Sequence, residues 1–141
     1  MTQIGGQLEV SRNSIADLCV YLEKAGLIGQ LRTATGGIQG LGKVDKIYLD
    51  NTPLIYTLGR QDVEIGTVRE TFFFNQTRSL CSVTTSPVSD FLIDGKYTFE
   101  VGGKKKRQRQ LQSIENGYVV KDDIETGYGN IIPLWMFGML Y

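Results

Sequence analysis

The sequence predicts a mixed α/β domain in which helices flank a mixed β-sheet. From residue 66 onward, hydrophobic periodicity and turn signals indicate elements in the order helix, three strands, helix, strand. The dipeptide Asp94-Gly95, between two of these strands, is a strong signal for a tight β-hairpin. An amphipathic helix followed by two more strands is expected ahead of this region, so both halves of the chain mix helices with strands.

The first helix is expected to begin after Ser11, a residue type that caps helix N-termini, and to end at Gly26. Strands are expected at residues 27–31 and 46–50, with a glycine-rich loop at 36–42 between them. This order matches a winged-helix fold from its recognition helix onward, so residues 1–50 are predicted to be a partial winged-helix segment. The apolar stripe of the helix consists of Ile15, Leu18, Cys19 and Leu22.

Residues 51–141 are predicted to form a second unit. A short helix to about residue 59 should follow Asp50, and a longer helix with Val68 and Phe72 on its apolar face should follow that. The ranges expected for this unit are a helix at 66–80, strands at 81–85, 88–94 and 96–101, a basic helix at 104–116, and strands at 118–121 and 132–137.

Composition limits the function classes. The chain has 141 residues, and its 15 Lys and Arg balance its 15 Asp and Glu, so any contact with nucleic acid must come from a local cluster. It has no histidine, the commonest metal ligand and general base. Cys19 and Cys81 lie in apolar surroundings, as expected for reduced thiols in the cytoplasm. No apolar run is long enough to cross a membrane.

The segment Gly37–Val44 matches the GxxxxGK core of a phosphate-binding loop. The next position of that motif supplies a hydroxyl for magnesium, and Val44 has none. Such a loop also leads into a helix, whose N-terminal amides hold the phosphates, whereas this one leads into a strand. We therefore predict a hairpin loop or wing here and no ATP binding.

A basic cluster opens the helix expected at 104–116. A helix macrodipole disfavours positive charge in its first turns, and bound phosphate would offset that cost. The cluster thus indicates contact with nucleic acid, while a charged surface helix remains the alternative. Its members are Lys104, Lys105, Lys106, Arg107 and Arg109.

Six segments spread over nearly the whole chain carry a resemblance to a known family. They are Glu23–Ile28, Lys46–Asp50, Gly66–Phe73, Asp90–Gly95, Phe99–Val101 and Ile132–Trp135. In these segments the chain resembles the C-terminal domain of unknown function that follows the AAA-type ATPase module in many bacterial and archaeal ATP-binding proteins. The element order and the Asp90…Glu100 motif resemble the PD-(D/E)XK nuclease-like superfamily. The resemblance implies an upstream ATPase module, which alone would bind ATP.

In that superfamily a helix glutamate and two strand carboxylates gather Mg²⁺, and a lysine two residues after the last of them orients the attacking water. Carried over by position, the carboxylates are Glu70, Asp90 and Glu100, with Asp90 and Glu100 as the two main metal ligands and Glu70 as the candidate for a third. Oxygen ligands of this kind suit Mg²⁺. The chain departs from the pattern in having Gly102 at the lysine position. Lys104 lies on the same strand face, but the four residues span roughly 13 Å, so it must fold back to reach the site.

The sequence therefore predicts a nuclease-like accessory domain of an AAA-type ATPase in the cytoplasm. It would engage nucleic acid or a partner through a basic helix beside an Asp/Glu cleft, with Mg²⁺ as the cofactor. Because of Gly102, we expect little or no cleavage. The alternative is a structural module that mediates oligomerisation or target recognition without binding nucleic acid.

Overall fold

The structure is a computed structural model that describes residues 11–34, 43–59, 62–106, 111 and 113–140. Its helices and strands follow one another in the order predicted for most of the chain. The bounds are α2 (Arg12–Lys24), β1 (Ile28–Arg32), β2 (Val44–Leu49), α3 (Thr52–Gly59), α4 (Ile65–Arg78), β3 (Val83–Thr85), β4 (Phe91–Ile93), β5 (Tyr97–Gly102), β6 (Gly117–Lys121), β7 (Ile131–Pro133) and the 3₁₀ helix η2 (Leu134–Met139).

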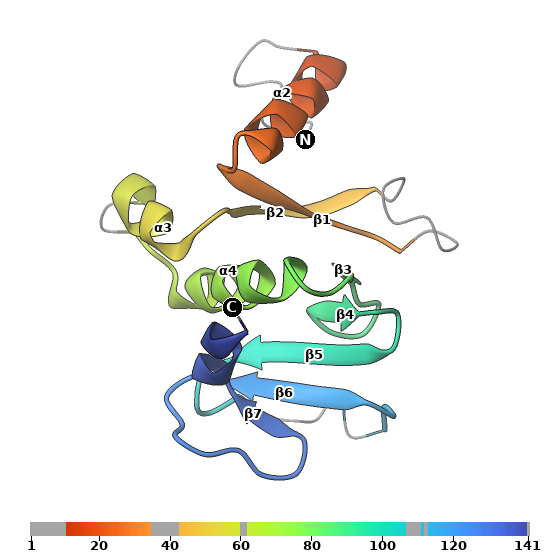
Figure 1. The fold of residues 1–141 in the computed structure, drawn as a ribbon, viewed down its shortest axis with the longest axis vertical. Helices are drawn as coiled ribbons and strands as arrows, with labels where there is room; N and C mark the ends of the chain where they lie inside the picture. The colour runs from red at the N-terminus through yellow and green to blue at the C-terminus, as the bar shows by residue number, and fades with distance from the viewer. Residues whose placement is uncertain (1–10, 35–42, 60–61, 107–110, 112, 141) are drawn as a thin grey trace.

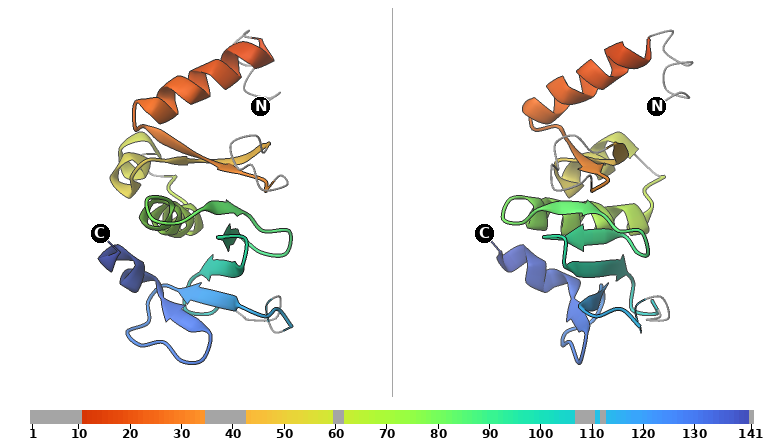
Figure 2. Two further views of the ribbon diagram at one scale, coloured as in Figure 1. Left: turned by 45° about the vertical axis from the view of Figure 1, so that its right-hand side comes forward. Right: turned by 90° about the vertical axis from the view of Figure 1, so that its right-hand side faces the viewer.

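The strands form one mixed sheet in the order β2-β1-β3-β4-β5-β6-β7 (Figure 1). Neighbours β1/β2, β3/β4 and β4/β5 are antiparallel, whereas β1/β3, β5/β6 and β6/β7 are parallel. Figure 2 shows α4 and η2 on the same side of β5–β7, and α2 at one end of the molecule beyond the β1/β2 hairpin. The predicted α/β class with a mixed sheet and flanking helices is confirmed.

The main core lies between α4 and the sheet, and its centre is aromatic. Phe73 of α4 packs against Phe91 and Phe99, with ring centroids 5.1 and 5.3 Å apart. Alternation along β6 sends Val120 into this core and Val119 into a smaller cluster with Leu111. The two faces of the sheet are therefore covered by different parts of the chain.

Two predictions that depend only on residues close together in the sequence are confirmed. The Ser11 hydroxyl accepts the Ser14 amide at 3.2 Å and caps α2 as expected. Asp94 and Gly95 both have positive φ, at 52° and 65°, as a type I′ turn requires. The Lys96 amide donates to the Ile93 carbonyl at 3.0 Å and closes this turn, so the predicted hairpin between β4 and β5 is confirmed.

The basic helix expected at 104–116 is wrong for the residues that the structure describes. Lys104 and Lys105 lie in a turn closed by the Lys106 amide, which donates to the Gly103 carbonyl at 2.9 Å, and the described residues from Leu111 to Asn116 also form turns. Positive charge in the first turns opposes the helix dipole, and the preceding glycines favour a bend. Arg107 and Arg109 lie outside the described residues.

The last strand is shorter than expected. It ends at Pro133, and residues predicted to extend it to 137 instead form η2. Proline lacks the amide that a strand needs for pairing, which is why it stands at the strand end.

The predicted boundary at residue 50 does not coincide with a break in the sheet. β1 pairs with β3 at Arg32 and Thr84, and Leu31 and Tyr48 belong to the main core. The division into two units and the winged-helix assignment therefore remain predictions. The glycine-rich segment 36–42 lies outside the described residues. Among those described, no helix is both long and apolar enough to span a membrane, and both cysteines are free.

Candidate active site

The hairpin register places Asp90 and Glu100 across from each other. Phe91 pairs with Phe99 on antiparallel strands, and the two acids are the next residues outward. The Val101 amide donates to Oδ2 of Asp90 at 2.8 Å, which fixes the carboxylate against β5. Glu100 is only 5% exposed. Because Phe99 and Val101 point into the core, Glu100 points to the other face of the sheet, together with position 102.

Lys106 supplies a cation at Glu100. Its Nζ lies 2.5 Å from Oε1 of Glu100, and its stem runs over Gly102. A Cβ atom at position 102 would lie 2.8–2.9 Å from Cβ, Cγ and Cδ of Lys106, closer than such atoms can approach. Lys106 thus fills the space in which a side chain at position 102 would begin. The lysine that folds back is Lys106, whereas Lys104 is exposed in the turn.

Glu70 lies on α4, and its negative charge is near enough to raise the pKa of Asp90. Its Oε2 accepts hydrogen bonds from the Tyr48 hydroxyl at 2.7 Å and from the Lys46 ammonium at 3.0 Å. Both donors come from β2, where alternation places them on one face. Tyr48 is buried, so this contact anchors Glu70 to the sheet.

The charges of these groups are coupled. Burial raises the pKa of Asp90 above its ordinary value, and the negative charges of Glu100 and Glu70 raise it further, against the opposing effects of the Val101 amide and Lys106. Burial and the hydrogen bond to Glu70 raise the pKa of Tyr48. We call Glu70, Asp90, Glu100 and Lys106 the carboxylate–lysine cluster.

Lys106 remains protonated at neutral pH. Its burial lowers the pKa, but the hydrogen bond to Glu100 and the charges of Glu100, Asp90 and Glu70 outweigh burial, so the pKa is raised overall. A permanently charged ammonium can stabilise negative charge on a phosphate, whereas it cannot act as a general base.

Ser89 completes the surroundings of Glu100. Its hydroxyl donates a short hydrogen bond to Oε2 of Glu100 and lies 3.0 Å from the Phe99 carbonyl oxygen. Both carboxylate oxygens of Glu100 therefore have polar contacts, one to an ammonium and one to a hydroxyl. These contacts set the orientation of a buried carboxylate.

Asp90 and Glu100 offer carboxylate oxygens of the kind that Mg²⁺ prefers, and the ion would compete with Lys106 for Oε1 of Glu100. Within the described part of the chain, no group of three acids, cysteines or histidines is placed to hold a metal, so the structure does not bring Glu70, Asp90 and Glu100 together as one three-carboxylate site. Mg²⁺ commonly binds through one or two carboxylates and completes its shell with water and phosphate oxygens. The pKa of Asp90 is raised first by burial and then by the negative charges of Glu100 and Glu70, and a bound cation would offset the contribution of those charges.

The basic turn adjoins this site directly. Lys104 and Lys105 are exposed and immediately precede Lys106 in the chain. On the other side, Lys46 is exposed on β2 while it contacts Glu70. Exposed cations therefore border the acidic site on two sides.

Sequence reasoning missed Tyr48, Lys46 and Ser89 and gave Lys106 only a surface role. The Lys46–Ile–Tyr48 alternation did signal two polar groups on one strand face. This alternation did not indicate that the two groups contact Glu70, which is distant in the chain. The strand-face argument selected Lys104 as the lysine that folds back and left Lys106 among the residues expected to contact nucleic acid.

Comparisons with known proteins give no family assignment. No protein-family model, no curated protein and no solved structure matches the chain.

Proposed function

We propose that the chain is a nuclease-like domain that binds nucleic acid and Mg²⁺ at the carboxylate–lysine cluster. Because Lys106 brings a cation to Glu100, we replace the expectation of little or no cleavage with the proposal that a phosphodiester is cleaved there. The observation that carries this proposal is the position of Lys106. Its stem over Gly102 and its ammonium at Glu100 provide the cation that the motif otherwise lacks.

In the proposed reaction, Asp90 and Glu100 would hold the metal, which would lower the pKa of a bound water and polarise the phosphate. Lys106 would stabilise the negative charge that develops on the phosphate oxygens. Tyr48 and Lys46 would hold Glu70 in place, and Ser89 would orient Glu100. Lys104 and Lys105 would contact phosphates along the strand without reading its sequence.

By the resemblance stated above, this domain would act in the cytoplasm as the C-terminal accessory domain of an AAA-type ATPase. Nucleic acid would then be delivered to the cluster by the ATPase module. A full-length coding sequence with that module upstream is the observation that tests this part of the proposal.

The activity is tested by incubating plasmid and single-stranded DNA with Mn²⁺ and matched lysine variants. We expect cleavage by the wild type and a loss of about 10²–10³-fold in Lys106→Gln, which keeps a hydrogen-bond donor but removes the charge. Lys104→Gln serves as the control for net charge and should retain most of the rate. Glu100→Gln should be inactive.

Circular dichroism must show that each variant is folded, because removing one partner of a buried ion pair destabilises a protein. Cleavage that survives in Glu100→Gln would come from a contaminant, and equal rates in the two lysine variants would refute the role of Lys106. Absence of cleavage by the wild type, together with no metal binding, would leave the interaction module as the better description.

A further inference from the structure

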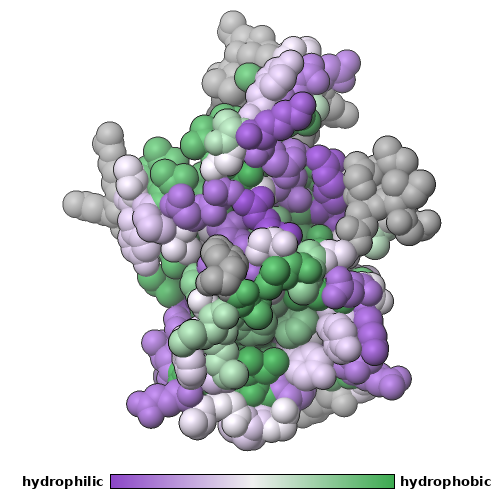
Figure 3. Space-filling model, in the orientation of Figure 1, coloured by the Kyte–Doolittle hydropathy of each residue, from purple (hydrophilic) through white to green (hydrophobic). Residues whose placement is uncertain are grey.

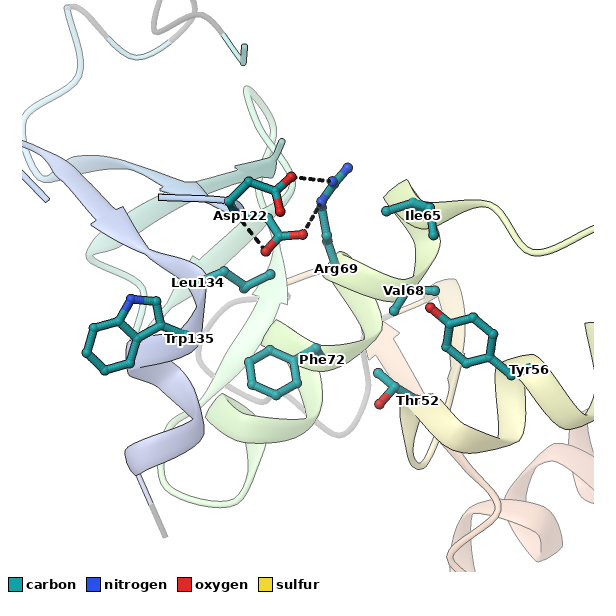
Figure 4. Close-up of a pocket in the computed structure, with 10 residues that line it drawn as sticks. Thr52, Tyr56, Ile65, Val68, Arg69, Phe72, Asp122, Leu134 and Trp135 are labelled. Atoms are coloured by element: carbon teal, nitrogen blue, oxygen red, sulfur yellow. Dashed lines mark hydrogen bonds and ion pairs between the residues drawn. The ribbon is translucent and has the colours of Figure 1, made fainter. Parts of the chain in front are cut away.

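A second site lies on the face of α4 turned away from Glu70. Ile65, Val68, Arg69 and Phe72 follow the i, i+3, i+4, i+7 spacing of one helix face. This face forms the floor of a cavity of about 530 Å³ between α3 and η2 (Figure 4). That volume is within the range of sites that bind small ligands or single side chains of a partner.

One wall of this groove is aromatic. Tyr56 of α3 lies beside Phe72, whereas Trp135 borders the groove from η2 with its indole turned away from Phe72, and the two residues are 51% and 52% exposed (Figure 4). The Trp135 indole donates to the Glu125 carbonyl at 3.3 Å, which fixes the ring while leaving much of it open. Rigid aromatic side chains with half their surface exposed are typical of binding hot spots.

Apolar surface continues beside the groove. Met136, Met139 and Leu140 are all exposed on or just after η2. In Figure 3, apolar surface gathers over η2 and just beside it. Methionine side chains adapt to the shape of a partner, so this surface suits protein contact.

One end of the groove carries surplus negative charge. Arg69 donates to Asp122 at 2.9 Å and lies 3.6 Å from Asp123, so one guanidinium faces two carboxylates. Asp123 is 68% exposed at its side chain and has φ of 59°, an unusual backbone conformation for a residue other than glycine. The spare carboxylate charge would repel phosphate and attract a basic side chain.

We infer that this groove binds a peptide segment of a partner protein that carries a bulky apolar residue next to a basic one. The apolar side chain packs against Tyr56 and Phe72, and the basic side chain meets Asp123. This site is distinct from the carboxylate–lysine cluster and does not depend on its chemistry.

Trp135 is the only tryptophan in the chain, so its fluorescence reports directly on the groove. The probe is an acetylated, amidated peptide of sequence Ser-Ala-Phe-Arg-Ser, and its counterpart carries glutamate in place of arginine. We expect a saturable change in Trp135 emission with the arginine peptide, and binding about threefold weaker or more for the glutamate peptide.

Matched variants locate the binding. Tyr56→Ala removes a wall and should weaken the arginine peptide about tenfold, whereas Leu58→Ala, on the same helix and 66% exposed, should leave the affinity unchanged. Asp123→Asn should remove the preference for arginine over glutamate. Lys106→Gln should bind the peptide as the wild type does, which separates this result from the proposed nuclease activity.

Three outcomes would overturn the inference. The first is the absence of a saturable change in Trp135 emission up to millimolar peptide. The second is equal affinity for the arginine and glutamate peptides. The third is an emission change caused by a single-stranded oligonucleotide and not by peptide, which would make the groove a nucleic-acid surface.

Discussion

The ammonium of Lys106 lies 2.5 Å from the Glu100 carboxylate while the stem of the same lysine covers Gly102. The two facts belong together, because only a residue without a side chain at position 102 leaves room for that stem. Gly102 is therefore the residue that allows a lysine from the following turn to reach Glu100. A lysine on the strand itself would compete for the same space.

Replacing Gly102 should disturb both the fold and the site. In Gly102→Ala the new methyl group would lie within 3 Å of Cβ, Cγ and Cδ of Lys106, and Cβ cannot move without the turn. We expect a loss of about 1–3 kcal/mol in the free energy of unfolding, as for other overpacked sites. Urea denaturation measures the change, and ¹⁵N spectra of the lysine ammonium groups would show whether Lys106 leaves Glu100.

Gly66→Ala is the matched control. Position 66 lies in α4, and its nearest neighbour would be Oε1 of Glu64 at 3.5 Å, an ordinary contact. Alanine favours a helix over glycine, so this variant should be unchanged or more stable by up to about 1 kcal/mol. Equal effects at the two positions would show that the space over Gly102 is not restricted.

The confirmed predictions depend on residues close together in the sequence, whereas the wrong one depends on a tertiary contact. The Ser11 cap and the Asp94-Gly95 turn depend on residues within a few positions, and both are found. The turn at Gly103–Lys106 is stabilised by a contact with Glu100 on the preceding strand, which helix propensity does not include. Local pattern favoured a helix there, and tertiary contact together with the charge of the first turn overrides it.

The residues of the candidate site also differ in whether local sequence could predict their contacts. Asp90 and Glu100 could be predicted to face each other because a hairpin signal fixes their register. The partners of Glu70 could not be predicted from the sequence, because Tyr48 and Lys46 belong to a strand that meets α4 only in the folded chain. Hydrogen bonds between residues so far apart in the chain depend on how α4 packs against the sheet. No short segment of the sequence specifies that packing.

Asp90→Asn should stabilise the protein at neutral pH. Burial and the charges of Glu100 and Glu70 raise the pKa of Asp90 in the folded state above its ordinary value of 3.8. The folded state therefore binds the proton more readily than the unfolded state. This stabilisation is complete below pH 3.8 and is lost as the pH rises through the folded pKa. At pH 7 the charged carboxylate thus costs stability, whereas asparagine carries no charge and still offers an oxygen to the Val101 amide.

Urea denaturation from pH 4 to pH 8 tests this claim. The midpoint of Asp90→Asn should exceed that of the wild type at pH 7, and the difference should shrink toward pH 4. Mg²⁺ should raise the midpoint of the wild type more than that of the variant, because a ligand stabilises only the state that binds it. Asp17→Asn, at an exposed position of α2, should show neither effect. A variant less stable than the wild type at pH 7 would contradict the cost assigned to Asp90.

The exposed lysines of the turn should govern the salt dependence of nucleic-acid binding. Each phosphate contact to a single strand adds about 0.7 to the slope of log affinity against log salt. Lys104→Ala and Lys105→Ala should each lower the slope by about that amount, and Lys24→Ala, at the exposed C-terminal end of α2, should not. Between 50 and 200 mM salt, each lost contact makes the fall in affinity about threefold smaller.

Fluorescence anisotropy with labelled oligonucleotides of two unrelated sequences measures both the slope and the affinity. The two sequences should respond alike because phosphate contacts carry no sequence information. Slopes that stay unchanged in both turn variants would show that the turn does not touch the backbone, and a response limited to one sequence would indicate base contacts instead.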